Sequence, residues 1–274
     1  MSASTILLTE AKYATDWEQL RTAGLRLFAE IDGNNFYLSG TLVHDAAPLF
    51  FEHYSINTNE SFLSEVNIKA VRKQLTWLDG VAISKMIVAV QNVHYKLLPF
   101  EFSASQIDAQ KLCSDSSAFL NGKIVYGIDY KINIALQSFC AQVAIKHSMI
   151  GLLHQTSALT ATYTDAVLCN IHATAIDIIV WQNSKVKMLN TFNIVTPEDI
   201  VYFIQLAIQN HFKKEAPQLL IGGEIIQQSK IYSTIGKFFN PLDMANRVAL
   251  KHQGVYKTLA PNRFLSLSGI IACE

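Results

Sequence analysis

Residues 166–224 read AVLCNIHATAIDIIVWQNSKVKMLNTFNIVTPEDIVYFIQLAIQNHFKKEAPQLLIGGE, and this stretch decides the fold of the chain. It opens with apolar and β-branched runs that short polar segments interrupt, which is the pattern of strands joined by turns. It therefore predicts an antiparallel meander with strands at residues 167–174, 176–182 and 186–192 and a turn at Asn183-Ser184.

A helix with clear start signals follows the meander. Thr196 is a typical N-cap residue, and Pro197 suits the first helical position. Apolar residues then recur at helical spacing, so one face of the helix is expected to pack on a sheet. A buried strand, residues 218–221, comes next and ends at Gly222-Gly223.

The same order of elements occurs earlier in the chain. Asp32-Gly33-Asn34 lies between two alternating apolar runs and predicts a hairpin, since Gly33 tolerates the positive φ of a tight turn. Three strands, a helix and a buried strand are expected at residues 25–31, 36–40, 49–56, 61–75 and 85–90, with Asn59 or Ser61 as the helix cap. The repeated order predicts one fold used twice.

The remaining segments give weaker patterns. Residues 9–24 are interpreted as a lead-in segment. Strands are expected at residues 124–127, 132–137 and 247–251, and helices at residues 139–148, 152–159, 225–239 and after Pro261.

We therefore expect an α/β protein with two duplicated halves, each with a mixed five-stranded sheet flanked by helices. The N-terminal half would span residues 1–160 with an inserted segment at 94–123, and the C-terminal half would span 161–258. The last helix, within residues 259–274, would pack back on the first half.

Composition and charge argue against several classes of protein. The 274 residues are half hydrophobic, enough for a large core, and Lys plus Arg equals Asp plus Glu at 22 each. Without a basic stripe, no nucleic-acid or anionic-membrane partner is expected.

The apolar runs are too short for a membrane span, and the N-terminus has no signal-peptide pattern, so we expect a cytoplasmic protein. The cysteines are widely separated, which argues against a structural zinc site or a disulfide framework: Cys113, Cys140, Cys169 and Cys273. No metal site is expected.

The duplicated order resembles the superfamily of actin, heat-shock chaperones and sugar kinases, whose halves have a ribonuclease H-like fold. More specifically, the chain is similar to a Bacteroidetes family of unknown function that is called domain of unknown function 3822 and has an actin-like ATPase fold. Four segments carry this resemblance along nearly the whole chain: residues 25–33 (LRLFAEIDG), 97–99 (LLP), 154–157 (HQTS) and 268–274 (SGIIACE).

The resemblance implies a nucleotide site with an acid at the end of the first strand of each half, followed by glycine. The second half instead has Asn170, which carries no charge, and no glycine follows it. The first half offers Glu30 and Asp32-Gly33, but a hairpin turn explains Asp32-Gly33 more simply than a magnesium ligand does.

The segment that would contact adenosine matches better. The resemblance makes Gly222, Gly223, Glu224 and Thr174 the candidate nucleotide-binding residues, because paired glycines after a buried strand let a ligand lie against the backbone. The alternative is that the two glycines only make a tight turn.

Other catalytic signals are missing. Ser157 and Ser184 lack the Gly-x-Ser-x-Gly setting of a hydrolase nucleophile, and His147 and His154 lack a third metal ligand. We therefore assign no catalytic residue.

The favoured interpretation is a degenerate, non-catalytic interaction or scaffold module without a cofactor. Its partner would be an unidentified protein or a second copy in a homo-dimer. The alternative is an ATPase or small-molecule kinase that binds ATP and magnesium in the cleft between the halves.

Overall fold

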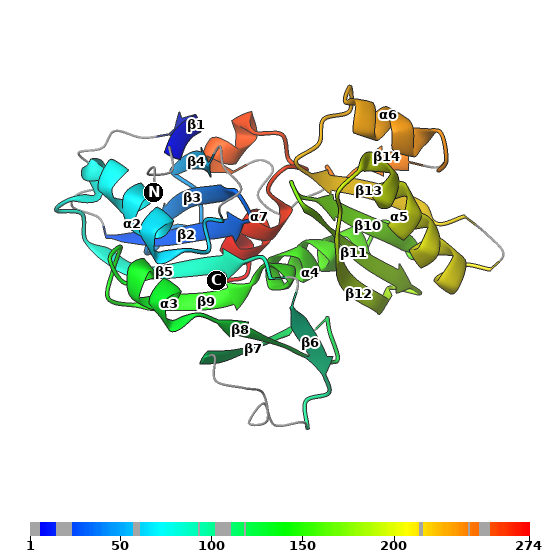
Figure 1. Cartoon of the computed structure of the whole chain (residues 1–274), viewed down its shortest axis with the longest axis horizontal. Coiled ribbons are helices and arrows are strands. Elements are labelled where there is room, and N and C mark those ends of the chain that lie inside the picture. The colour runs from blue at the N-terminus through cyan, green and yellow to red at the C-terminus, as the bar shows by residue number, and fades with distance from the viewer. Residues whose placement is uncertain are drawn as a thin grey trace.

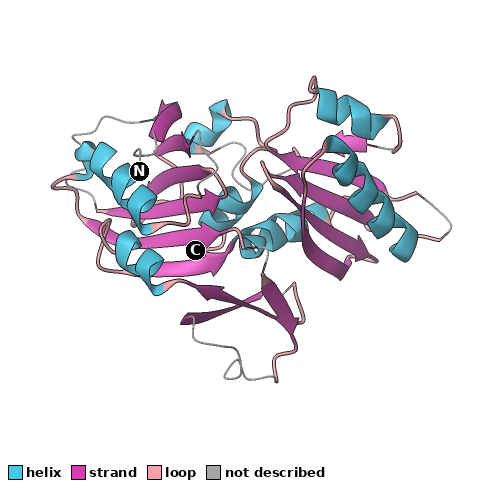
Figure 2. Cartoon of the chain, in the orientation of Figure 1, coloured by secondary structure: helices cyan, strands magenta, loops and turns pink. Residues whose placement is uncertain are grey.

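The computed structural model describes residues 6–14, 24–56, 61–92, 94–101, 111–117, 119–213, 216–240, 242–246 and 253–274. It contains two α/β halves side by side and a small separate sheet below the first half (Figures 1 and 2).

The first half is built on a six-stranded mixed sheet in the order β1-β4-β3-β2-β5-β9. Its elements are β1 (Ile6–Tyr13), β2 (Leu25–Asp32), β3 (Asn35–Leu42), β4 (Phe50–Ile56), α2 (Glu65–Gln74), a 3-10 turn η1 (Thr76–Leu78), β5 (Ile83–Val90), α3 (Tyr130–Leu136), β9 (Val143–His147) and α4 (Ser148–Leu159). The β2–β3 hairpin closes at Asp32↔Asn35, and Gly33 has the positive φ of 48° that the turn needs.

A three-stranded antiparallel sheet is inserted between β5 and α3. Its order is β6-β8-β7, with bounds Tyr95–Leu98, Lys111–Ser117 and Gly122–Ile128 for β6, β7 and β8. Two contacts with β9 tie it to the first half: the Tyr126 hydroxyl donates to the Ile145 carbonyl at 3.2 Å, and the His147 amide donates to the Asp115 carboxylate at 2.7 Å.

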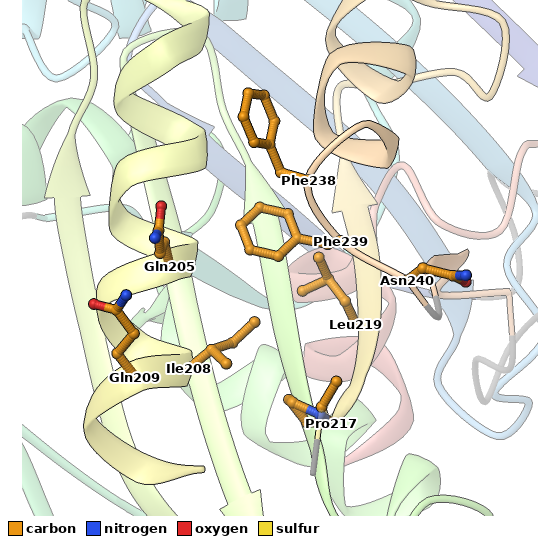
Figure 3. Close-up of a pocket in the computed structure, with 9 residues that line it drawn as sticks. Gln205, Ile208, Gln209, Pro217, Leu219, Phe238, Phe239 and Asn240 are labelled. Carbon is orange, nitrogen blue, oxygen red and sulfur yellow. The ribbon is translucent and has the colours of Figure 1, made fainter. Parts of the chain in front are cut away.

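The second half has a five-stranded mixed sheet in the order β12-β11-β10-β13-β14. Its elements are β10 (Ala166–Ile171), β11 (Ala175–Gln182), β12 (Lys185–Asn193), α5 (Pro197–His211), β13 (Gln218–Gly223), α6 (Lys230–Gly236) and β14 (Leu242–Met244). A 3-10 turn η2 (Gly254–Thr258) and α7 (Leu265–Ala272) follow in the chain. Thr196 and Asp199 form a capping box that fixes the start of α5. A groove lies between α5 and the segment that follows α6 (Figure 3).

The two sheets confirm the duplication. In the first sheet, β2, β3 and β4 form an antiparallel meander, β2 pairs in parallel with β5, and β5 pairs in parallel with β9. In the second sheet, β10, β11 and β12 form the same meander, β10 pairs in parallel with β13, and β13 pairs in parallel with β14. Only β1 has no counterpart among the described strands of the second sheet. The expected α/β class with mixed sheets is therefore confirmed, although the first sheet has six strands rather than five.

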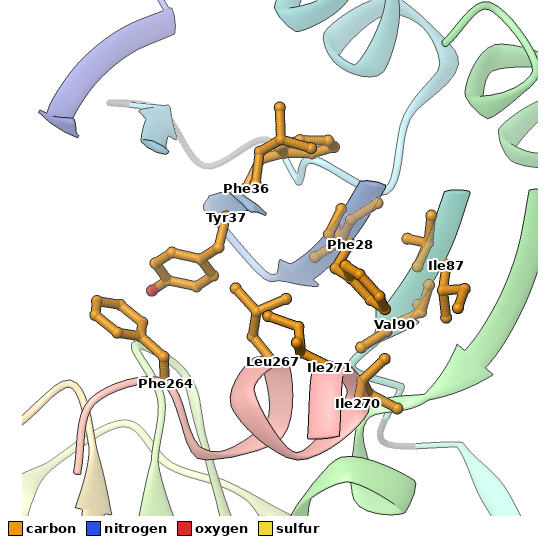
Figure 4. Close-up of a cluster of buried hydrophobic side chains, with 14 of the residues drawn as sticks. Phe28, Phe36, Tyr37, Ile87, Val90, Phe264, Leu267, Ile270 and Ile271 are labelled. Atoms are coloured by element: carbon orange, nitrogen blue, oxygen red, sulfur yellow. The ribbon is translucent and has the colours of Figure 1, made fainter. Parts of the chain in front are cut away.

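Two helices, α4 and α7, lie between the sheets. The largest apolar core joins the first sheet to these helices and to the facing side of the second sheet, and a second core lies under α5 and α6. Figure 4 shows Leu267, Ile270 and Ile271 of α7 directed at Phe28 and Val90 of the first sheet. The C-terminal helix thus packs on the first half.

The backbones of α4 and α7 cross at two glycines. A Cβ atom added to Gly269 would lie 2.0 Å from the Gly151 carbonyl oxygen, and one added to Gly151 would lie 2.0 Å from the Ser266 carbonyl oxygen. The Gln155 amide donates to the Ser268 hydroxyl at 2.9 Å beside this crossing. Only glycine allows the helices to approach this closely.

Several expected elements are wrong. The lead-in at residues 9–24 contains part of β1. Residues 132–136 belong to the helix α3 instead of a strand, because Asp129 caps a helix by accepting from the Lys131 amide at 2.8 Å. Residues 139–148 are not a helix, because residues 143–147 add β9 to the edge of the first sheet beside β5.

The second half has two further differences. The helix expected at residues 225–239 is the shorter α6, capped by Ser229. The strand expected at residues 247–251 lies outside the described residues, and β14 is the described strand beside β13.

Candidate functional site

The first strands of the two halves end facing each other. Asp32 ends β2, and the chain leaves β10 through His172. The two turns that follow are in contact, since a Cβ added to Gly33 would lie 3.6 Å from the Thr174 hydroxyl. The structure therefore brings together the two strand ends at which the resemblance implies a nucleotide site.

An ionic cluster fills this junction. His172 Nδ1 lies 2.8 Å from Asp32 of the first half, and Nε2 lies 2.7 Å from Asp177 of β11. Asp177 also accepts from the Thr191 hydroxyl at 2.7 Å. Asp32, His172 and Asp177 are only 1%, 5% and 0% exposed, so each charge depends on the others for compensation.

The imidazole of His172 is charged in this setting. Burial disfavours the imidazolium, but the Asp32 and Asp177 carboxylates outweigh burial and raise the pKa of His172 well above its ordinary value. Burial likewise opposes ionisation of Asp177, yet the His172 charge lowers the pKa of Asp177. The junction is thus a carboxylate–imidazolium–carboxylate bridge between the halves.

Asn170 completes the cluster from the end of β10. Its side-chain amide lies 3.0 Å from His172 Nε2. Because both nitrogens of an imidazolium donate, the Asn170 oxygen rather than its nitrogen belongs beside Nε2. An aspartate here would add a third carboxylate around one imidazolium, so the uncharged residue suits this cluster.

Glu30 lies behind the cluster, fully within the protein. Burial, together with the Asp32 charge, raises the pKa of Glu30 to about 8, although His172 opposes the shift. Its carboxyl group accepts from the Leu267 amide at 3.0 Å, near the start of α7. At neutral pH Glu30 is therefore largely protonated and tied to α7, which does not suit a magnesium ligand.

The raised pKa of Glu30 predicts a pH dependence of stability. The folded chain keeps this proton up to about pH 8, whereas the unfolded chain releases it near pH 4.5, so the free energy of unfolding should fall as pH rises through this window. His172 changes the free energy of unfolding in the same direction. Its contribution to stability is complete below about pH 6.5 and is lost as pH rises through its raised pKa.

Glu30→Gln should therefore flatten the decline in stability between pH 5 and 8, as measured by denaturant unfolding at several pH values. Glu65→Gln is the control. Glu65 lies in the first turn of α2 with 37% of its side chain exposed, and its hydrogen bond with Lys69 lowers its pKa, so it stays ionised throughout this window and should leave the decline unchanged. Equal slopes for wild type and Glu30→Gln would show that Glu30 does not titrate in this window.

Gly222 and Gly223 are covered by protein atoms. A Cβ added to Gly222 would lie 2.2 Å from the Leu265 side chain, and one added to Gly223 would lie 2.0 Å from the Ile171 carbonyl oxygen. Gly223 also has a positive φ of 90°. Both glycines are thus required by the packing of β13 against β10 and α7.

The backbone amides of Gly223 and Glu224 and the side chain of Glu224 already have hydrogen-bond partners within the protein. The Gly223 amide donates to the Asn262 carbonyl at 2.7 Å, and the Glu224 amide donates to the Ile171 carbonyl at 2.8 Å. The Tyr37 hydroxyl donates to the Glu224 carboxylate. These groups would have to break protein contacts before they could bind a phosphate.

The cavity between the halves is too small for ATP and magnesium as its residues are arranged. The cavity that Asp32, His172, Gly223 and Glu224 help to line has a volume of about 10 Å³, which is room for about one water molecule. Within the described ranges, no group of three or more His, Cys, Asp or Glu side chains is arranged to hold a metal ion. Nucleotide binding in this cavity would require the halves to separate at His172. His172 and Glu224 also line a separate open pocket of about 240 Å³ beside the start of α5.

Sequence reasoning identified Asp32 and Asn170 but missed His172 and Asp177. Asp177 lies inside the otherwise apolar run AIDIIVW, and a carboxylate in a buried strand needs a partner charge. The position of Asp177 in this run was therefore a signal for a buried charge pair, but the sequence does not identify His172 as the partner.

Comparisons with known proteins agree with this architecture. A family sequence profile described as Protein of unknown function (DUF3822) matches residues 85–242. No curated protein matches the chain. The described helices include none with the length and apolar composition that crossing a membrane requires.

Solved structures share the fold at low sequence identity. A Bacteroides thetaiotaomicron protein described as having an actin-like ATPase fold and unknown function aligns at a TM-score of 0.72 and 13% identity, covering 95% of this chain and 99% of that one. The fold of the chain is therefore actin-like, with two lobes.

Two further neighbours have the same fold. A structure of the PilM-PilN type IV pilus biogenesis complex aligns at a TM-score of 0.56 and 11% identity, covering 92% and 98% of the two chains. The ethanolamine utilization protein EutJ from Carboxydothermus hydrogenoformans aligns at 0.50 and 8% identity, covering 89% of each chain.

Proposed function

Because this chain belongs to the family described as Protein of unknown function (DUF3822) and has an actin-like fold, we propose that it is a non-catalytic cytoplasmic interaction or scaffold module. One observation carries the proposal. The imidazole of His172 occupies the junction between the halves and joins Asp32 to Asp177. A nucleotide phosphate in the same place would have to displace a buried ion pair.

The surrounding contacts support a closed cleft. Breaking a buried ion pair costs several kcal/mol, about 3–5 when one partner is lost. The nucleotide would have to offset this cost and also separate the turns at Gly33 and Thr174. The halves are therefore expected to act as one rigid unit without a cofactor.

A protein partner is consistent with the neighbours of this fold. The PilM-PilN structure is an example in which a protein of this fold is part of a protein complex. At 11% identity the likeness gives no partner for this chain, and a second copy of the chain remains the other candidate partner.

The proposal is tested by calorimetric titration of the purified chain with ATP and ADP in the presence of magnesium, up to millimolar ligand. We expect no saturable heat and no ATP hydrolysis above background. Saturable binding with hydrolysis that Asp32→Asn abolishes, in a variant whose circular dichroism is unchanged, would overturn the proposal in favour of an ATPase or kinase.

A further inference from the structure

A groove in the second half is separate from the closed cleft. It lies between α5 and the segment that follows α6, and its volume is about 310 Å³. Figure 3 shows Ile208 of α5 facing Phe239 across the groove, with Leu219 of β13 at its base. This is the size at which pockets begin to hold a ligand or the anchoring side chains of a partner.

The lining is apolar with a rim of neutral amides. The apolar lining residues are Ile208, Ala216, Pro217, Leu219, Phe238 and Phe239, and the amides are Gln205, Gln209 and Asn240. None of these lining side chains is ionisable, so the groove itself offers no charged group for binding an ion or an anionic metabolite.

Two of the aromatic residues at the groove are incompletely covered. Phe238 is 63% exposed, and Phe239 is only partly buried although it packs against the core beneath α5 and α6. Tyr202, 60% exposed, lies on the same helical stripe as Gln205 and Gln209 and extends the apolar surface along α5. Large aromatic side chains left exposed around a recess are typical of protein-binding sites.

The charges that flank the groove in sequence are mainly positive. Among the described residues, Lys213 follows α5, Lys237 comes directly before Phe238, and Asp243 lies three residues after Asn240, so two lysines and one aspartate flank the groove. Lys213 and Lys237 are exposed. Neither forms a salt bridge within the described part of the chain.

From the apolar recess and its basic borders, we propose that the groove binds an acidic segment of a partner protein. One aromatic or leucine side chain of the segment enters the recess between Ile208 and Phe239, and flanking Asp or Glu residues meet Lys213 and Lys237. The rim amides hydrogen-bond the backbone of the segment. This inference rests on the proposed interaction role and gives that role a surface and a partner chemistry.

The test is selection of a random-peptide phage library on the purified full-length chain. We expect the enriched peptides to share an aromatic or leucine residue with acidic neighbours. A synthetic peptide of the enriched sequence is then titrated against the chain by fluorescence anisotropy at two salt concentrations.

Phe238→Ala should raise the Kd of this peptide about tenfold or more, because it removes an aromatic wall of the recess. Lys213→Glu combined with Lys237→Glu should raise the Kd chiefly at low salt. Phe100→Ala is the matched control, since Phe100 is 52% exposed but lies in the inserted segment of the first half, and it should leave the Kd unchanged.

Gln209→Glu provides a second variant of nearly the same size that keeps the apolar contacts and places a negative charge on the rim, so it should weaken binding of the acidic peptide, most strongly at low salt. Enrichment of basic peptides, no enrichment, or equal binding to wild type and Phe238→Ala would overturn the proposal. Concentration-dependent dimerisation that Phe238→Ala abolishes would also overturn it, because a second copy would then be the occupant. The ATP titration examines the other site, so its result and this one are separable.

Discussion

His172→Ala is expected to lower the free energy of unfolding by about 3–5 kcal/mol, the usual cost of removing one partner from a buried ion pair. The substitution leaves the carboxylates of Asp32 and Asp177 buried without their shared cation. Urea unfolding near neutral pH measures the loss.

Two further variants separate charge from packing. His44→Ala is the control, because His44 is exposed, and it should change stability by less than about 0.5 kcal/mol. Adding Asp32→Asn to His172→Ala should recover part of the loss, since it removes one unpaired charge. If His172→Ala cost no more than His44→Ala, the bridge would not stabilise the fold.

Gly269→Ala is the second substitution with a large expected effect. Its Cβ would lie 2.0 Å from the Gly151 carbonyl oxygen, and both atoms belong to helix backbones that cannot move independently. We expect α4 and α7 to separate at a cost of about 3 kcal/mol, the upper end for overpacking a core. Thermal unfolding followed by circular dichroism measures the shift.

Gly236→Ala is the matched control within a helix. The nearest atom to its added Cβ is a Leu242 methyl group at 3.5 Å, so the alanine fits, and its better helix propensity should give a gain of up to about 1 kcal/mol. Equal melting temperatures for Gly269→Ala and Gly236→Ala would mean that the helices are not in backbone contact.

Much of the architecture follows from local sequence. The meander, α5 and β13 of the second half were predicted correctly, because the turn at Asn183-Ser184, the Thr196 cap and the apolar runs all favour the same structure. The hairpin at Asp32-Gly33 was predicted for the same reason. Local signals agreed there, so no long-range information was needed.

The two main errors in the first half have different causes, one local and one long-range. The alternation of apolar residues at 132–137 suits a strand, but the Asp129 cap and the burial of Ile132, Ala135 and Leu136 make a helix. Residues 143–147 become a strand because the edge of β5 is available for pairing. The Asp129 cap and the i, i+3, i+4 spacing of these buried residues are local helix signals that the alternation outweighed, whereas the pairing of residues 143–147 with β5 is not visible in the local pattern.

The site itself was predicted only in part. Asn170 indicated that the usual acid of the second half was replaced, and the structure supplies the physical context, because the neighbouring His172 lies between two carboxylates. The partner of His172 in the first half, Asp32, is 140 residues away in sequence. A single chain without its fold gives no means of pairing them.

The filled cleft is tested most directly by nitrogen-15 NMR of the His172 ring, recorded at neutral pH before and after addition of millimolar ATP and magnesium. We predict that both ring nitrogens carry protons held by Asp32 and Asp177, and that their resonances do not change with nucleotide. A neutral imidazole, or ring resonances that shift in a saturable way with ATP, would contradict a cleft closed by His172.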